Sequence, residues 1–247
     1  MAIIRCQNLT FPNIQAVIFD KDGTLEDSQS FLRELGHKRS RLIDAQIPGI
    51  GEPLLMAFGI QGDTLDPTGL MAVGSRRENE IAAAAYIAET GRGWIESLAI
   101  ARRAFEEADR YLKDAAGTSP LFAGSLEVLK FLSDAGLKLG ILSADSTAGV
   151  QNFVKRHQLE MYIQLQQGVD QDVSKPDPRL FLQACQTLGV EPGCTLMVGD
   201  SRGDMEMGRK AGAAGCIGIN WSKSGTVYLE GADVAITQLD EIQVIEA

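Results

Sequence analysis

Hydrophobic residues follow two different patterns along this chain. Between residues 26 and 118 they recur every three to four positions, as they do in amphipathic helices. Before and after that stretch, short uninterrupted apolar runs alternate with helical segments, which is typical of strands buried on both faces of a parallel sheet. The pattern therefore predicts an α/β fold, a doubly wound parallel sheet with helices on both faces, with an all-helical module inserted into it.

The elements can be assigned in chain order. Ile3 and Ile4 indicate a short edge strand, and the first core strand is expected at residues 15–19. Within the insertion, Asp27 and Ser28 can cap a first helix, residues 62–75 read as a loop, and no strand is expected. Further helices are predicted at 49–60, 76–90, 94–116, 124–135, 147–157, 178–188 and 205–211, and further strands at 137–142, 162–165, 195–198, 216–219 and 233–236.

Composition excludes several classes of partner. The chain has 247 residues, 45% of them hydrophobic and 23% charged, which is ordinary for a globular protein. The net charge of −10 argues against nucleic acid and against an anionic membrane surface as partners. No apolar run approaches the roughly 18 residues of a membrane-spanning helix, and residues 1–15 lack the apolar segment of a secretory signal.

The four cysteines, Cys6, Cys185, Cys194 and Cys216, form no Cys-x-x-Cys pair. A chain of this size does not need a disulfide framework. We therefore expect reduced, mostly buried thiols in a cytoplasmic protein.

The first core strand runs directly into two carboxylates, Asp20 and Asp22. Side chains two positions apart in a strand point the same way, so the two charges would repel each other unless a cation or a proton lay between them. Gly23 then permits a sharp turn. Open α/β sheets bind their ligands at this end of the strands. The competing interpretation is a polar strand end followed by an Asx-type turn.

Three further strand ends carry polar groups. Ser143 and Ala144 offer a hydroxyl and backbone amides, Lys175 precedes a proline, and Asp200 and Asp204 form a second carboxylate pair. Each also has a simpler explanation. Ser143 could cap the next helix, Lys175 could be an exposed loop lysine, and the aspartates could cap a helix or complement its dipole.

Together these segments resemble the motifs of the haloacid dehalogenase-like hydrolase superfamily. Residues 20–24, Asp-Lys-Asp-Gly-Thr, resemble its first motif, Ser143 the second, Lys175 the third, and residues 199–204 the fourth. The helical insertion resembles that family's first cap type, and residues 218–221 and 232–234 are similar to the tail of the phosphoglycolate phosphatase-like branch.

Two positions depart from the family pattern. Lys21 stands where an apolar residue is more usual, and Ala144-Asp145 replaces the Asn or Thr often found after the second motif.

The resemblance implies a Rossmann-like hydrolase core at residues 1–25 and 119–247, a helical cap at 26–118, and hydrolysis of a phosphomonoester. In this interpretation Asp20 is the nucleophile that forms an aspartyl-phosphate, and Asp22 is the general acid and base. Mg²⁺ would be held by Asp20, the Asp22 carbonyl and Asp200, with Asp204 close by. Lys175, Ser143 and Ala144 would contact the phosphate, and Thr24 would orient Asp22.

The cap would then select the substrate. Arg76 follows a Gly-Ser turn and suits a second anion or carboxylate, although a solvated helix start explains it equally well. We expect a small phosphate ester as substrate, phosphoglycolate first, and a monomer or homodimer. A sugar phosphomutase and a phosphate-binding protein without turnover are the alternatives. A dehalogenase is disfavoured because it needs neither a metal nor a second aspartate at position 22.

Overall fold

The computed structural model describes residues 2–115, 119–170, 173–221 and 229–246. The chain divides into a core unit, Met1–Asp27 with Leu121–Ala247, and a helical unit, Ser28–Pro120. The boundaries predicted from the sequence, after residues 25 and 118, fall beside those of the two units.

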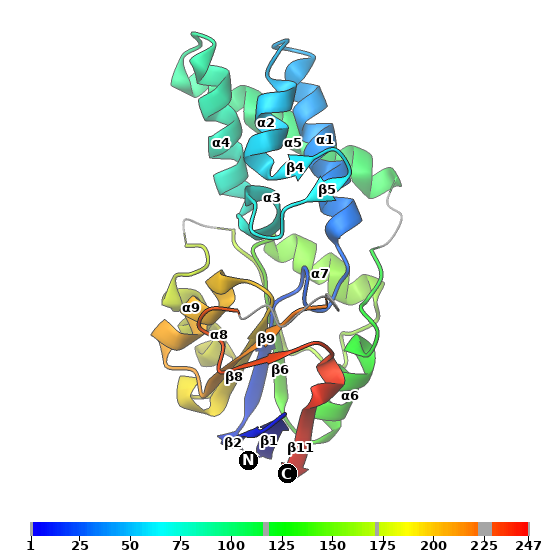
Figure 1. Ribbon diagram of the computed structural model, residues 1–247, viewed down its shortest axis with the longest axis vertical. Coiled ribbons are helices and arrows are strands. Elements are labelled where there is room, and N and C mark those ends of the chain that lie inside the picture. The colour runs from blue at the N-terminus through cyan, green and yellow to red at the C-terminus, as the bar shows by residue number, and fades with distance from the viewer. Residues whose placement is uncertain (1, 116–118, 171–172, 222–228, 247) are drawn as a thin grey trace. The chain divides into compact units, whose positions relative to one another are not determined.

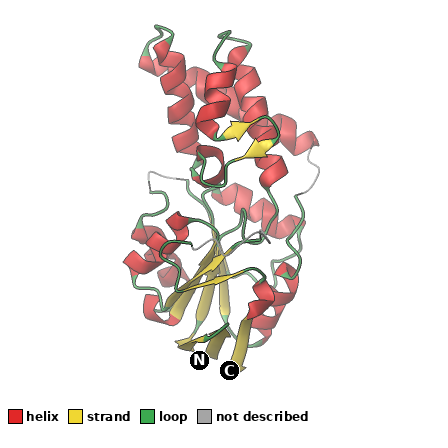
Figure 2. Cartoon of the chain, in the orientation of Figure 1, coloured by secondary structure: helices red, strands yellow, loops and turns green. Residues whose placement is uncertain are grey.

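The core unit is built on a six-stranded parallel sheet in the order β10-β9-β8-β3-β6-β7 (Figures 1 and 2). This confirms the doubly wound α/β fold that the apolar runs predict. The strands are β3 (Ala16–Phe19), β6 (Lys138–Leu142), β7 (Leu165–Gln167), β8 (Thr195–Gly199), β9 (Gly215–Ile219) and β10 (Val234–Ile236). The helices are α6 (Ser125–Asp134), α7 (Thr147–Arg156), α8 (Pro178–Leu188) and α9 (Arg202–Ala211).

The central strand β3 is buried along its whole length because both faces of the sheet are covered. Val17 and Phe19 pack on one face with residues of α6 and α7, whereas Ala16 and Ile18 pack on the other with residues of α8 and α9 (Figure 1). Burial of a large apolar side chain contributes about 1.5–3 kcal/mol. These contacts fix the strand whose end carries Asp20.

A second sheet of three antiparallel strands, in the order β11-β1-β2, completes the core unit. The strands are β1 (Ala2–Cys6), β2 (Leu9–Ile14) and β11 (Ile242–Glu246). The sequence indicated only the first of them. Strand β2 contains Pro12 and buries only Phe11 and Ile14, and β11 buries only Ile242, so neither shows a strong apolar pattern.

The helical unit has an apolar core of its own, which includes Leu35, Ile43, Phe58 and Phe105. Its helices are α1 (Gln29–Asp44), α2 (Gly51–Phe58), α3 (Leu70–Val73), α4 (Arg76–Glu89) and α5 (Trp94–Ala115). The expectation that it contains no strand is wrong, because β4 (Ile60–Gln61) pairs with β5 (Thr64–Leu65). Strands of two residues are too short to produce a periodic pattern.

Two boundaries in the core unit also differ from prediction. Strand β7 begins at Leu165, because Tyr162 and Ile163 continue the turn that follows α7. Helix α9 begins at Arg202, earlier than predicted, because Ser201 caps it in a capping box with Asp204. Within the described ranges, none of the helices combines the length and the apolar character that a bilayer crossing requires.

The cysteines give a test of this core. Cys6, Cys185 and Cys216 are buried, and burial raises the pKa of the Cys6 and Cys216 thiols to about 12 and also raises that of Cys185. Cys194 is partly exposed. Only a thiolate reacts with a disulfide reagent. We expect 5,5′-dithiobis(2-nitrobenzoic acid) to modify Cys194 rapidly and the other three thiols only after unfolding. Cys194→Ser should abolish the rapid phase, and a second rapid thiol would contradict the burial of Cys6, Cys185 and Cys216.

Candidate active site

The turn after β3 brings Asp20 to the edge of the sheet and holds it there. The Asp20 amide donates to the Val198 carbonyl of β8 at 2.8 Å. Gly23 has φ +77°, and a Cβ atom at this position would overlap Oδ2 of Asp200. A glycine is therefore required here both for the backbone conformation and for the space it leaves.

The strand register gathers the other motifs at the same edge. Phe19 at the end of β3 is paired with Ile141 of β6 on one side and with Val198 of β8 on the other. The segments that follow all three strands thus emerge at one level. Ser143 and Asp200 consequently lie beside the turn that carries Asp20.

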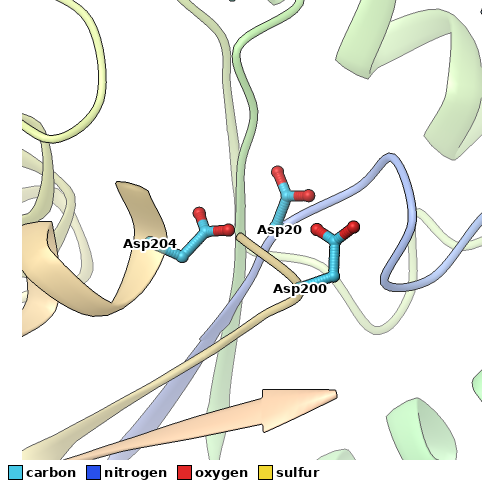
Figure 3. A group of neighbouring side chains, drawn as sticks. All are labelled: Asp20, Asp200 and Asp204. Atoms are coloured by element: carbon cyan, nitrogen blue, oxygen red, sulfur yellow. The ribbon is translucent and has the colours of Figure 1, made fainter. Parts of the chain in front are cut away.

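Three carboxylates meet at this edge. Asp20 follows β3, Asp200 follows β8, and Asp204 lies in the first turn of α9, and each points an oxygen into a shared space (Figure 3). These three oxygens all lie within 4.8 Å of one another.

Lys175 is the cation of the cluster. Its Nζ lies 2.5 Å from Oδ1 of Asp20 and 2.6 Å from Oδ1 of Asp204, and its side chain is only 6% exposed. The explanation of Lys175 as an exposed loop lysine is therefore wrong. Burial alone would lower the pKa of Lys175, but the two carboxylates outweigh it and raise that pKa.

The cluster still carries an excess of negative charge. The pKa of Asp20 is raised to about 7: burial is the largest cause, Lys175 opposes the rise, and repulsion from Asp204 and Asp22 adds to it. Burial, together with Asp20 and Asp204, also raises the pKa of Asp200 well above its usual value. A cation with oxygen ligands would relieve this repulsion, so the donor set fits a hard divalent ion such as Mg²⁺.

Asp204 makes two sets of contacts, and one of them confirms the helix-cap interpretation. Its Oδ2 accepts hydrogen bonds from the Ser201 amide at 3.1 Å and from the Ser201 hydroxyl at 2.6 Å, which completes the capping box of α9. Its Oδ1 faces Lys175. Thr24 donates its hydroxyl to Oδ1 of Asp200 at 3.5 Å, so the expectation that it orients Asp22 is not what the structure displays.

Ser143 is buried at the end of β6 and does not cap α7, because Ser146 does so by accepting from the Gly149 amide. The Ser143 hydroxyl accepts from the Asp145 amide at 3.1 Å. The Ala144 amide has no acceptor among the described residues. This strand end thus offers a hydroxyl and a backbone donor beside Asp20.

Asp22 lies outside the three-carboxylate cluster. Its two oxygens lie 2.8 and 3.0 Å from Nζ of Lys21, which also lies 3.2 Å from Asp145 and 3.6 Å from Glu26. Sequence reasoning missed this set of ion pairs. The sequence did contain an indication of it. The two residues that depart from the motif pattern, Lys21 and Asp145, carry opposite charges and could have been expected to pair.

Arg76 belongs to the helical unit, where it pairs with acids of the same unit. Its Nε lies 2.8 Å from Oε1 of Glu80, and its guanidinium also contacts Asp109 of α5. The side chain is 34% exposed and stands at the first position of α4. The ion pairs hold α4 to α5.

Comparisons with known proteins identify relatives of this chain. Residues 14–212 match the model of the haloacid dehalogenase-like hydrolase family. Phosphoglycolate phosphatase from Salmonella choleraesuis is 30% identical over 93% of this chain and 88% of its own length. N-acetylmuramic acid 6-phosphate phosphatase from Pseudomonas putida is 28% identical over 81% of this chain and 80% of its own.

A solved structure shares the fold. The crystal structure of a predicted phosphoglycolate phosphatase from Haemophilus somnus 129pt has a TM-score of 0.71 and 20% identity, and covers 93% of this chain and 96% of that one. The extent of the family match and the identity to the Salmonella protein decide the assignment. This chain belongs to the haloacid dehalogenase-like hydrolases.

Proposed function

We propose that the protein is a Mg²⁺-dependent phosphatase that hydrolyses a small phosphomonoester through an aspartyl-phosphate at Asp20. The observation that carries this proposal is the pairing of Asp20 with Lys175 inside the cluster completed by Asp200 and Asp204. A carboxylate nucleophile, a cation for phosphoryl oxygens and an all-oxygen metal site are the groups that phosphoryl transfer to a side chain needs.

The reaction has two steps. An Asp20 oxygen attacks phosphorus, the bond to the leaving oxygen breaks, and that oxygen takes a proton from the Asp22 carboxyl. Water then attacks the phosphorus of the aspartyl-phosphate and gives a proton to the Asp22 carboxylate, which releases inorganic phosphate and restores Asp20. Lys175, Ser143 and the Ala144 amide bind the phosphoryl oxygens as charge develops on them.

The residues that would hold Mg²⁺ are Asp20, Asp200 and the Asp22 carbonyl, with Asp204 close by. When bound, the ion supplies positive charge that offsets the phosphate and the carboxylates together. Lys175 by itself faces three carboxylates, which is why a second cation suits the site.

The substrate class that we favour is a phosphomonoester that also carries a carboxylate. The names of the two bacterial relatives, phosphoglycolate phosphatase and N-acetylmuramic acid 6-phosphate phosphatase, each specify such a compound. We propose that the helical unit acts as a cap and that Arg76 binds the carboxylate, since a guanidinium pairs with carboxylates in a bidentate geometry. Phosphoglycolate is the first candidate, and the protein acts in the cytoplasm.

Asp20→Asn tests the nucleophile. We expect kcat for 4-nitrophenyl phosphate to fall at least about a thousandfold, because an amide does not form the acyl-phosphate. The melting temperature should hold or rise, since a buried charge that is repelled by its neighbours is removed. Asp134→Asn, at an exposed position in α6, is the matched control and should leave both measurements unchanged. Wild-type turnover in the Asp20→Asn variant would refute the assignment.

Metal dependence gives the second test. We expect the chelated protein to be inactive, to regain activity with Mg²⁺ and to be inhibited by Ca²⁺. Ca²⁺ accepts more ligands in a looser geometry, and it could bind both oxygens of Asp20 and so block attack. A titration of the chelated protein with each ion, read by released phosphate, measures this. Full activity in excess chelator would remove the metal from the mechanism.

Arg76→Ala tests recognition by the helical unit. We expect kcat/KM for phosphoglycolate to fall roughly 10- to 150-fold relative to that for 4-nitrophenyl phosphate, which corresponds to a lost charge-assisted hydrogen bond of about 1.5–3 kcal/mol. Arg102→Ala is the matched control, because Arg102 is more exposed and contacts the same Glu80 at 3.6 Å. Wild-type kcat/KM with both esters would limit Arg76 to holding α4 to α5, and an equal fall with both esters would indicate damage to the helical unit.

A further inference from the structure

Lys21 is a buried cation that the proposed reaction does not use. It lies between Asp20 and Asp22 in sequence, and its side chain is only 7% exposed. A buried charge costs several kcal/mol unless it is paired, and an apolar residue at this position would avoid that cost. The burial of the Lys21 charge must therefore be explained by the groups that pair with it.

Three carboxylates surround the Lys21 ammonium. Asp22 lies at 2.8 Å, Asp145 at 3.2 Å and Glu26 at 3.6 Å. They come from three places: Asp22 from the turn after β3, Glu26 from the end of that turn, and Asp145 from the loop after β6. One cation thus joins the first and second motifs.

Two of these partners are themselves fixed. Arg156 of α7 pairs with Glu26, whose side chain is 3% exposed. The Ser146 amide donates to Oδ1 of Asp145 at 2.7 Å, which leaves Oδ2 for Lys21. Glu26 and Asp145 would therefore continue to neutralise Lys21 if Asp22 moved away.

Asp22 differs from the other two. Both of its oxygens lie within 3.0 Å of the Lys21 ammonium, and among the described residues no other side chain makes an ion pair or hydrogen bond with its carboxylate. The position of the Asp22 carboxylate thus depends on Lys21.

We infer that Lys21 is a positioning residue, which holds the Asp22 carboxyl beside the reacting phosphate while Asp145 and Glu26 keep the cation paired. The arrangement explains why Lys21 and Asp145 depart together from the motif pattern of the family. Each charge compensates the other across 3.2 Å. The inference rests on the proposed function, since it takes Asp22 as the proton donor.

The test is Lys21→Met, which removes the charge and nearly keeps the length of the side chain. The alkoxide of glycerol 2-phosphate needs a proton to leave, whereas 4-nitrophenolate does not, and kcat/KM reports only the steps up to this cleavage. We expect kcat/KM for glycerol 2-phosphate to fall at least about tenfold more than kcat/KM for 4-nitrophenyl phosphate. Lys21→Arg, which keeps a cation, should restore the ratio toward that of the wild type, and Lys130→Met, at an exposed site in α6, should leave it unchanged.

If Lys21→Met lowered kcat/KM equally with both esters, or with neither, the inference would be overturned, because a merely structural lysine affects both esters alike. Unfolding of Lys21→Met, Asp22→Asn and the double variant gives a second measurement that does not depend on activity. We expect the shift in melting temperature caused by Asp22→Asn in the wild-type protein to differ from the shift that it causes in the Lys21→Met variant. Identical shifts would show that Lys21 does not hold Asp22. A wild type that cleaved neither ester would refute the proposed function, and the unfolding measurement would still decide the contact.

Discussion

The ion pairs of Lys175 with Asp20 and Asp204 make it possible to bury these two carboxylates at one edge of the sheet, beside the partly buried Asp200. Such a group of like charges is unstable unless each is restrained and partly neutralised. Asp20 is restrained by the hydrogen bond of its amide to β8, Asp204 by the capping box of α9, and Asp200 by the Thr24 hydroxyl. In the proposed function, the negative charge that remains after these contacts attracts the cation, and Asp20 supplies the nucleophile.

The fold was predictable where burial is two-sided and not where it is one-sided. Strands β3, β8 and β9 are buried at every position, so each forms an apolar run that has no other simple interpretation. Strand β2 buries two residues and β11 buries one, and both are specified by pairing with β1. For β11 this is a contact between distant parts of the chain. The hairpin β4-β5 depends on a turn between two-residue strands, and no periodic signal can arise from so few positions.

In the candidate site, some residue positions were predictable from the sequence, whereas the side-chain partners were not. The positions of Asp20 and Asp200 follow from a parallel sheet, because its strand ends meet at one edge. Lys175 lies in the loop before α8, and its place beside Asp20 does not follow from the strand pattern. The side-chain partners do not follow, since they depend on rotamers and on the reach of long side chains. Thr24 thus contacts Asp200 rather than Asp22, and Lys21 reaches an aspartate of the next motif. Charged residues at positions that the motif pattern leaves apolar or neutral would have indicated the second of these contacts.

Both acidic partners of Arg76 are themselves paired with a second cation, Asp109 with Arg39 and Glu80 with Arg102. Asp109 pairs with Arg76 and also lies 3.3 Å from Arg39, which is buried over the face of Phe105. If Arg76 turned toward a substrate, Arg39 would still neutralise Asp109. The substrate group would have to replace two carboxylates, Glu80 and Asp109, as partners of the guanidinium. A neutral hydroxyl cannot do so, whereas a carboxylate can, because it offers the same charge and the same two oxygens. In the proposed function, the ion pairs of the helical unit therefore favour a substrate with a carboxylate at Arg76 over one that offers only hydroxyl groups beside its phosphate.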